Sequence, residues 1–259
     1  MILTVLVARG SAPISRRDSL VFGGSTSCYM VRAGGETVFL AAGTELQAAP
    51  SEYTKPPFFA ESSACRSSSG AGDVSPPVSK EAETTICIPS EDDHATQALD
   101  GLYAPPYWPL KLEDCGGRLQ ILPHSFPFQI GEISISGLKG CHPGGVWCFR
   151  LEYRGKTLVY ASVFEHEEPY FCDFIDFSRN ADLILYDAQY TEEEYERKKG
   201  YGHSTAEKGM ELLESSGAGQ LLLILHDPWN TDEQLLEHEA QIGKVNVLRY
   251  AREGEVIPV

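Results

Sequence analysis

Short runs that alternate apolar and polar residues fill the first two thirds of the chain. Runs rich in branched and aromatic residues at every second position are typical of strands with one buried face. Turns containing GG or RGK separate 27–33 from 37–42 and 147–153 from 157–162, and this spacing predicts two hairpins. The other strands predicted in this region are 3–8, 84–88, 119–123 and 128–138.

The last third of the chain changes to continuous apolar strands and amphipathic helices. The runs 181–188 and 220–225 are typical of strands buried on both faces. Between them, 204–219 predicts a helix, because it opens with a Ser/Thr cap and closes on glycine. A second capped helix is predicted over 230–243, and a terminal hairpin over 245–259. Strands followed by a β-α-β unit favour an α/β fold with four αββα layers.

One segment departs from this pattern. Residues 47–83 are rich in Pro, Ser, Gly and Ala and show little periodicity, which predicts a long, partly mobile surface insertion. The full length of 259 residues suits one large domain, so we expect 1–259 to form a single unit.

Charge and cysteine content narrow the function classes. The formal net charge of −16, from 21 Lys and Arg against 37 Asp and Glu, argues against extended nucleic-acid binding, which needs basic contacts to phosphates. No apolar run approaches the roughly 20 residues that a membrane helix needs. Seven cysteines without a C-x-x-C pair are typical of reduced thiols, and the N-terminus is unlike a secretory signal. We therefore expect a cytoplasmic protein.

Eight motifs in a fixed order carry a family resemblance. They are ARGSAP (8–13), FGGSTSCYMVRAGG (22–35), LAAGT (40–44), CHPGG (141–145), VYASVFEHEE (159–168), DLILYDAQYTEEEY (182–195), GYGHST (200–205) and LHDPWNTDE (225–233). In order and spacing they resemble metallo-β-lactamase-fold hydrolases on the ribonuclease Z and phosphodiesterase side of that superfamily. The resemblance implies a four-layered αββα metallo-β-lactamase sandwich.

The resemblance also implies two zinc ions bridged by a water, which the metals convert into a hydroxide nucleophile. The first ligands of the family lie in an H-x-H-x-D-H loop, which aligns with ICIPSEDDHA (86–95). In that alignment Asp93 and His94 match ligand positions. Pro89, which has no ligand atom, and Glu91 replace the two leading histidines.

The later ligand positions are only partly retained. His142 matches the histidine that the family has before the later hairpin. Val163 stands where the family has the aspartate that bridges both metals, and Leu225 stands where it has a histidine, directly before His226. Losing the bridging carboxylate argues against a dinuclear centre. A single zinc, manganese or iron ion is the alternative, held by Asp93, His94 and His142 with Glu91 or His226.

A proton donor and its partner are also implied by the resemblance. His203 in GYGHST matches the histidine that serves ribonuclease Z-like enzymes as general acid. Asp187 matches the carboxylate that orients it.

Each candidate has a structural alternative. Asp93 and His94 are also typical of a hydrogen-bonded pair that caps the following helix. His142 could bond to the backbone in a tight HPGG turn. His203 could have no role other than to cap the next helix.

Three functions stay open from the sequence. The first is a non-catalytic or scaffold protein that has lost the dinuclear zinc site and needs no cofactor. The second is a hydrolase of phosphodiester or related ester bonds with one remodelled metal and His203 as general acid. The third is a module that binds a small molecule or a protein at the old cleft, beside the aromatic segment 101–110. The resembling families also make a homodimer an expected state.

Overall fold

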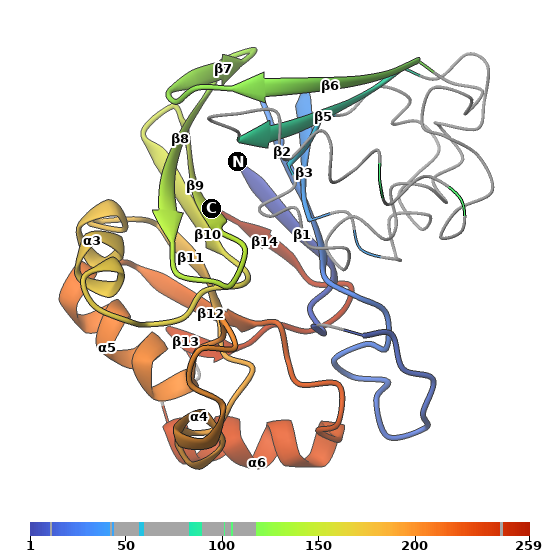
Figure 1. Ribbon diagram of the computed structural model, residues 1–259, viewed down its shortest axis with the longest axis vertical. Helices are drawn as coiled ribbons and strands as arrows, with labels where there is room; N and C mark the ends of the chain where they lie inside the picture. Colours follow the sequence, from blue (N-terminus) through green and yellow to red (C-terminus); the bar gives the residue numbers. More distant parts are fainter. Residues whose placement is uncertain are drawn as a thin grey trace.

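The computed structural model describes residues 1–10, 12–41, 43, 101, 105, 125–243 and 246–259 in full, and the backbone alone of 57–59, 83–89 and 118–124. These residues form two seven-stranded sheets (Figure 1). The first sheet has the order β14 (Val256–Pro258), β1 (Ile2–Val7), β2 (Cys28–Ala33), β3 (Glu36–Leu40), β4 (Pro57–Phe59), β5 (Glu83–Pro89) and β6 (Arg118–His124).

The second sheet is antiparallel at one side and parallel at the other. Its order is β13 (Leu248–Tyr250), β12 (Gln220–Ile224), β11 (Leu183–Asp187), β10 (Lys156–Ala161), β9 (Val146–Tyr153), β8 (Ile133–Gly140) and β7 (Phe128–Ile130). Strands β10 to β13 run parallel to one another, so their carboxyl ends meet at one edge of the sheet.

Both predicted hairpins are confirmed, and their turns have a common cause. Gly34 and Gly35 join β2 to β3 with φ of 63° and 89°, and Arg154 and Gly155 join β9 to β10 with φ of 49° and 77°. Positive φ at both turn residues matches the twist of the flanking strands. The GG and RGK sequences therefore fix the register of both hairpins.

A layer of helices covers the outer face of the second sheet (Figure 1). The predicted caps are confirmed: Thr205 and Thr231 accept from the backbone of the next turn, and Gly217 and Gly243 end the two helices with positive φ. The helices are α3 (Tyr170–Phe177), α4 (Glu192–Lys198), α5 (Ala206–Ser216) and α6 (Asp232–Ile242). Within the described ranges, no helix has the length and apolar character needed to cross a membrane.

Two apolar cores hold these layers together. Between the sheets, Leu3, Tyr29, Leu158 and Leu222 belong to a buried cluster that draws on strands of both sheets. A second cluster fills the space between the second sheet and the helices, with Phe174 among its members. Burying both faces of β10, β11 and β12 explains why these strands are continuous apolar runs.

Three sequence predictions need correction or completion. The terminal hairpin over 245–259 is wrong, because β13 pairs with β12 whereas β14 pairs with β1 in the other sheet. The single strand over 128–138 is two strands, β7 and β8, joined by a turn at Gly131. The segment 47–83, predicted as a surface insertion, contributes β4 to the first sheet. Apart from β4 and from Glu83, which begins β5, the segment lies outside the described residues.

A buried arginine ties the end of β1 to the loop after β12. The Arg9 side chain is fully buried, and its guanidinium donates to the carbonyls of Gly23, Asp227 and Asn230. It also pairs with the carboxylate of Asp232 at 3.3 Å. One cation thus satisfies acceptors from segments more than 200 residues apart in sequence.

Replacing this arginine should therefore destabilise the fold. We predict that Arg9→Met lowers the free energy of unfolding by about 3–5 kcal/mol, because it leaves buried acceptors and a carboxylate without a donor. The measurement is urea denaturation. Arg16→Met is the matched control, because Arg16 pairs with Asp18 in solvent and its loss should change stability by less than about 0.5 kcal/mol. Equal effects of the two substitutions would contradict the role of Arg9.

Candidate functional site

The predicted site residues that the structure describes gather where the parallel strands end. Asp187 is the last residue of β11, His226 follows β12, and His142 follows β8. His203 lies in the loop before α5. Glu91, Asp93 and His94 lie outside the described residues, directly after β5. The segment 101–110 is described only at residues 101 and 105.

The predicted pair of Asp187 and His203 is present. His203 Nδ1 lies 2.8 Å from Asp187 Oδ2, which fixes the Nδ1 proton toward the carboxylate and leaves Nε2 as the reactive nitrogen. The carboxylate is fully buried and also accepts from the backbone N–H groups of Phe164, Gln189 and Ser204. Burial raises the pKa of the Asp187 carboxyl, whereas His203 and the backbone donors oppose this shift. The pair is thus built to hold His203 in one orientation.

His142 lies beside this pair. The rings of His142 and His203 meet edge to face with centroids 6.0 Å apart. A Cβ added to Gly202 would overlap the His142 ring, and Gly202 has φ of 89°. Glycine is therefore required between the two histidines, both for the backbone conformation and for the close approach. The structural reason for GYGH is this contact.

Glu165 anchors the loop that carries His203. Its side chain is buried and accepts from the backbone N–H groups of Gly200 at 2.6 Å and Gly202 at 2.8 Å. A carboxylate that accepts two backbone donors fixes a glycine-rich loop that would otherwise be free to move. The sequence analysis did not single out Glu165. Its position directly before His166, within a motif that matched the family, was the available signal.

A second network lies behind His203. Ser204 Oγ is 2.7 Å from both His166 Nδ1 and Tyr186 Oη. Burial lowers the pKa of His166 to about 4, and Lys208 adds to the shift. His166 is therefore neutral near pH 7 and acts here as a hydrogen-bonding group. Ser204 and Tyr186 were not predicted from the sequence, because their contact joins different elements.

His226 has a different environment from the other histidines. Its ring is fully buried and packs edge to face with Phe22 and Tyr250, at 5.3 and 5.2 Å between centroids. Its Nε2 lies 2.8 Å from the carbonyl oxygen of Ala251, to which it donates. Burial lowers the pKa of His226 to about 3, despite the bond to Ala251, and the nearby Arg9 and Arg252 lower it further. His226 is thus a neutral histidine of the core.

Solved structures of known proteins share the fold of this chain over nearly its whole length. YhfI from Bacillus subtilis, a metallo-beta-lactamase fold protein, superposes with a TM-score of 0.75 at 18% identity, covering 99% of this chain and 98% of YhfI. Zn²⁺-bound PqqB from Methylobacterium extorquens gives 0.76 at 13% identity, covering all of both chains. The short form of human tRNase Z gives 0.67 at 15% identity, covering 100% of this chain and 99% of that one.

The chain has the metallo-β-lactamase fold. In sequence, 128 residues are 29% identical to the probable metallo-hydrolase YhfI of Bacillus subtilis. This match covers 48% of the chain and spans about half the length, 49%, of that curated relative. No family model matches the chain. The expected architecture is therefore confirmed at the level of the fold.

The metallo-β-lactamase fold implies a dinuclear zinc centre, and the described residues do not fit one. Val163 and Leu225 are apolar residues at two positions that the family resemblance matches to metal ligands. The lone pair left to His226 is on Nδ1, which has no hydrogen-bond partner but lies in an aromatic pocket with Arg9 and Arg252 as the charged neighbours. The charged groups that shift the pKa of His226 are both cations, which disfavours a dication beside this atom.

Other donors among the described residues do not gather into a metal site. Among the described residues, no group of three or more His, Cys, Asp and Glu side chains converges as a metal site. Burial and the neighbouring Glu167 and Glu165 raise the pKa of the Cys141 thiol to about 11. Cys141 therefore stays protonated near pH 7, which disfavours the thiolate that binds metals. We accordingly derive no catalytic step through a dinuclear centre.

The burial of His226 generates a prediction about acid stability. The folded-state pKa of about 3 lies below the ordinary value of 6.5. As the pH falls below 6.5, His226 therefore binds a proton in the unfolded chain but stays neutral in the folded chain. Stability should fall by about 2–3 kcal/mol between pH 7 and pH 4.5 from this group alone. His226→Gln, which keeps a donor for Ala251 but does not titrate, should remove that part of the fall.

Urea denaturation at the two pH values measures the difference between wild type and His226→Gln. The imidazole ¹⁵N signals of His226 should also stay those of a neutral ring protonated at Nε2 down to about pH 4. An imidazole that titrates near pH 6.5 would contradict the buried, neutral assignment.

Proposed function

We propose that this metallo-β-lactamase-fold protein has lost the dinuclear zinc site and acts as a non-catalytic or scaffold protein. The observation that carries the proposal is the environment of His226. A histidine at the edge where the fold implies metal ligands donates to Ala251 and packs between Phe22 and Tyr250 instead. Val163, in place of a bridging carboxylate, supports the same conclusion, because two dications a few ångströms apart need that negative charge.

A hydrolase with one remodelled metal is the second candidate function. It is favoured by the retained pair of Asp187 and His203, in which Nε2 of His203 could protonate a leaving group while Asp187 holds Nδ1. The proposed ligands are Asp93, His94 and His142, with Glu91 in support, and the metal would be zinc, manganese or iron. The similarity to a probable metallo-hydrolase and to tRNase Z adds to this candidate.

A cellular location and an assembly state are proposed as well. We propose a cytoplasmic location, because a reducing compartment suits cysteines that form no disulfide among the described residues. These are Cys28, Cys141, Cys148 and Cys172. A homodimer is proposed from the family resemblance alone.

Metal content and turnover decide between the two functions. We predict that protein purified without chelator carries only traces of zinc, manganese and iron by elemental analysis, because the described ligand positions do not form a site. Adding each metal should produce no turnover of bis(p-nitrophenyl) phosphate above buffer. The same assay on a dinuclear metallo-β-lactamase-fold phosphodiesterase is the positive control.

The opposite result has its own signature. The non-catalytic proposal would be wrong if the wild-type protein held near-stoichiometric metal and turned over the phosphodiester, and if the metal disappeared in His94→Ala. His203→Ala should then reduce turnover by about 10²–10⁴-fold with the metal retained, because it removes only the general acid. His238→Ala, a histidine substitution on α6 away from this edge, is the matched control and should change neither metal content nor turnover.

A further inference from the structure

Two loops beside the start of α6 expose large apolar side chains. Leu20, in the loop between β1 and β2, is 76% exposed, and Trp229, in the loop after β12, is 81% exposed. Val21 follows Leu20 and Leu236 lies on α6, and both are exposed as well. A single exposed apolar residue is normal on a soluble protein, whereas several together mark an interaction surface. We call the side chains of Leu20, Val21, Trp229 and Leu236 the apolar patch.

Hydrogen bonds hold the two loops side by side. The Val21 N–H donates to the carboxylate of Asp232, the first residue of α6, at 2.8 Å. The buried guanidinium of Arg9 donates to the carbonyls of Gly23 and Asn230, one from each loop. The loop between β1 and β2 accordingly lies beside the first turn of α6 (Figure 1). The apolar patch therefore stands on a pre-organised frame, which reduces the entropy lost when a partner binds.

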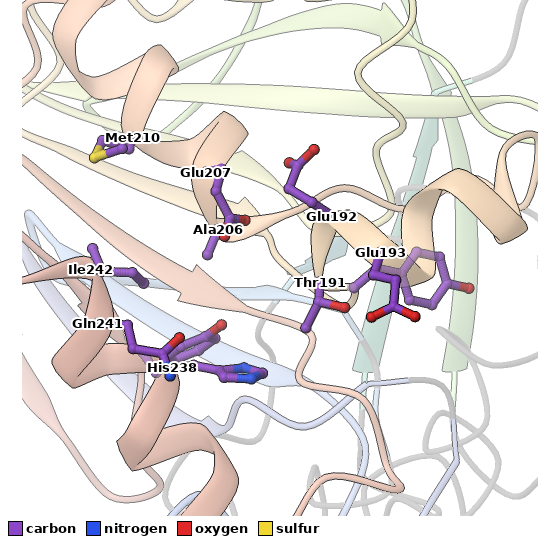
Figure 2. Close-up of a pocket in the computed structure, with 11 residues that line it drawn as sticks. Thr191, Glu192, Glu193, Ala206, Glu207, Met210, His238, Gln241 and Ile242 are labelled. Carbon is purple, nitrogen blue, oxygen red and sulfur yellow. The ribbon is translucent and has the colours of Figure 1, made fainter.

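Helix α6 has three faces, and one of them continues this surface. Leu235 and Glu239 are buried on the first face. The residues of the second face that line a pocket shared with α4 and α5 are His238, Gln241 and Ile242 (Figure 2). The third face carries Leu236 with Glu233 and Glu237, and all three are exposed. Residues three and four apart lie on the same side of a helix, so Leu236 and the two carboxylates share one surface.

Charges of both signs accompany the apolar patch. Arg16 and Arg17 precede Leu20 in its loop, and both are exposed. Arg16 pairs with Asp18 at 2.7 Å, whereas Arg17 has no ion-pair partner among the described residues. The carboxylates of Glu233 and Glu237 likewise have no cation beside them in the described part of the chain. The surface thus has a cation on the loop and two carboxylates on the helix, all available to a partner.

We propose that this surface binds a second copy of the chain about a two-fold axis. The two apolar patches meet face to face, and Arg17 of each copy lies against Glu233 and Glu237 of the other. A two-fold contact uses the same surface on both copies, so that surface must be complementary to itself. A cation on the loop and carboxylates on the helix meet this condition, because the half-turn places each opposite the other.

The overall charge of the chain favours this surface over others. Because the net charge is −16, most parts of two copies repel each other. A contact therefore needs a surface with cations of its own and an apolar centre. Trp229 is suited to that centre, because tryptophan is among the residue types that most often carry the binding energy of an interface. The contact uses none of the candidate site residues, so it is independent of both proposed functions. It gives the homodimer a surface that the family resemblance does not specify.

Sedimentation velocity of the full chain over a range of concentrations tests the proposal. The wild-type chain should sediment as a dimer at micromolar concentration. Trp229→Ala should weaken the dimer about 30-fold or more, because each dimer loses this anchor twice. Tyr170→Ala is the matched control, because it removes a partly exposed aromatic ring from α3, outside the apolar patch. The dimer of that variant should stay within about twofold of wild type.

Reversing the charges tests the two-fold pairing itself. Arg17→Glu in one variant, and Glu233→Lys with Glu237→Lys in another, place like charges opposite each other on both sides of the axis. Each variant alone should weaken its dimer about tenfold or more. An equal mixture of the two should form a mixed dimer within about threefold of the wild-type affinity, because opposite charges then meet on both sides. Mixing cannot repair a folding defect, so recovery identifies the contact.

Four results would overturn the proposal. The first is a chain that stays monomeric throughout, which would leave the apolar patch to a different partner. The second is a dimer that Trp229→Ala does not weaken, and the third is equal weakening by Tyr170→Ala and Trp229→Ala. The fourth is a mixture of the two charge variants that stays monomeric. The metal and turnover assays are separate measurements, so failure of the dimer and failure of the proposed function remain distinguishable.

Discussion

The candidate site depends on one buried carboxylate, that of Asp187. Asp187 is fully buried and must find donors within the protein, because an unpaired charge in the interior costs several kcal/mol. It finds them in the backbone after β10, in its own loop and in the 203–204 segment. His203 provides the remaining donor. Satisfying one carboxylate therefore fixes three loops relative to one another.

The same principle repeats around the carboxyl edge of the second sheet. Glu165 holds the 200–202 loop through two backbone N–H groups. Arg9 joins the end of β1 to the loop after β12, and Glu239 binds the backbone of Tyr250 and the guanidinium of Arg252. Each buried ion is satisfied by groups far apart in sequence. The loops of this edge are consequently held in place by charge and hydrogen bonding among protein groups.

This internal bonding holds the loops at the edge of the sheet where the family resemblance implies metal ligands. At two positions that the resemblance matches to ligands, the chain has Val163 and a Leu225 packed against Gly10, and His226 is a neutral histidine that donates to Ala251. A proton-donor pair and a tightly packed glycine beside His142 are retained.

The sequence by itself determined the features whose physics is local. Turn residues with positive φ fixed both hairpins, and threonine and glycine caps fixed α5 and α6. The resemblance of its motifs to a known family implied the fold and the pairing of Asp187 with His203. Only the tertiary structure decided the rest. The final strands entered different sheets because β14 found its partner in β1, at the opposite end of the chain. His226 became a core residue because Phe22, Tyr250 and Ala251 surround it. Such contacts join residues that are far apart in the sequence, so no short-range pattern predicts them. They form only when the layers of the fold pack together.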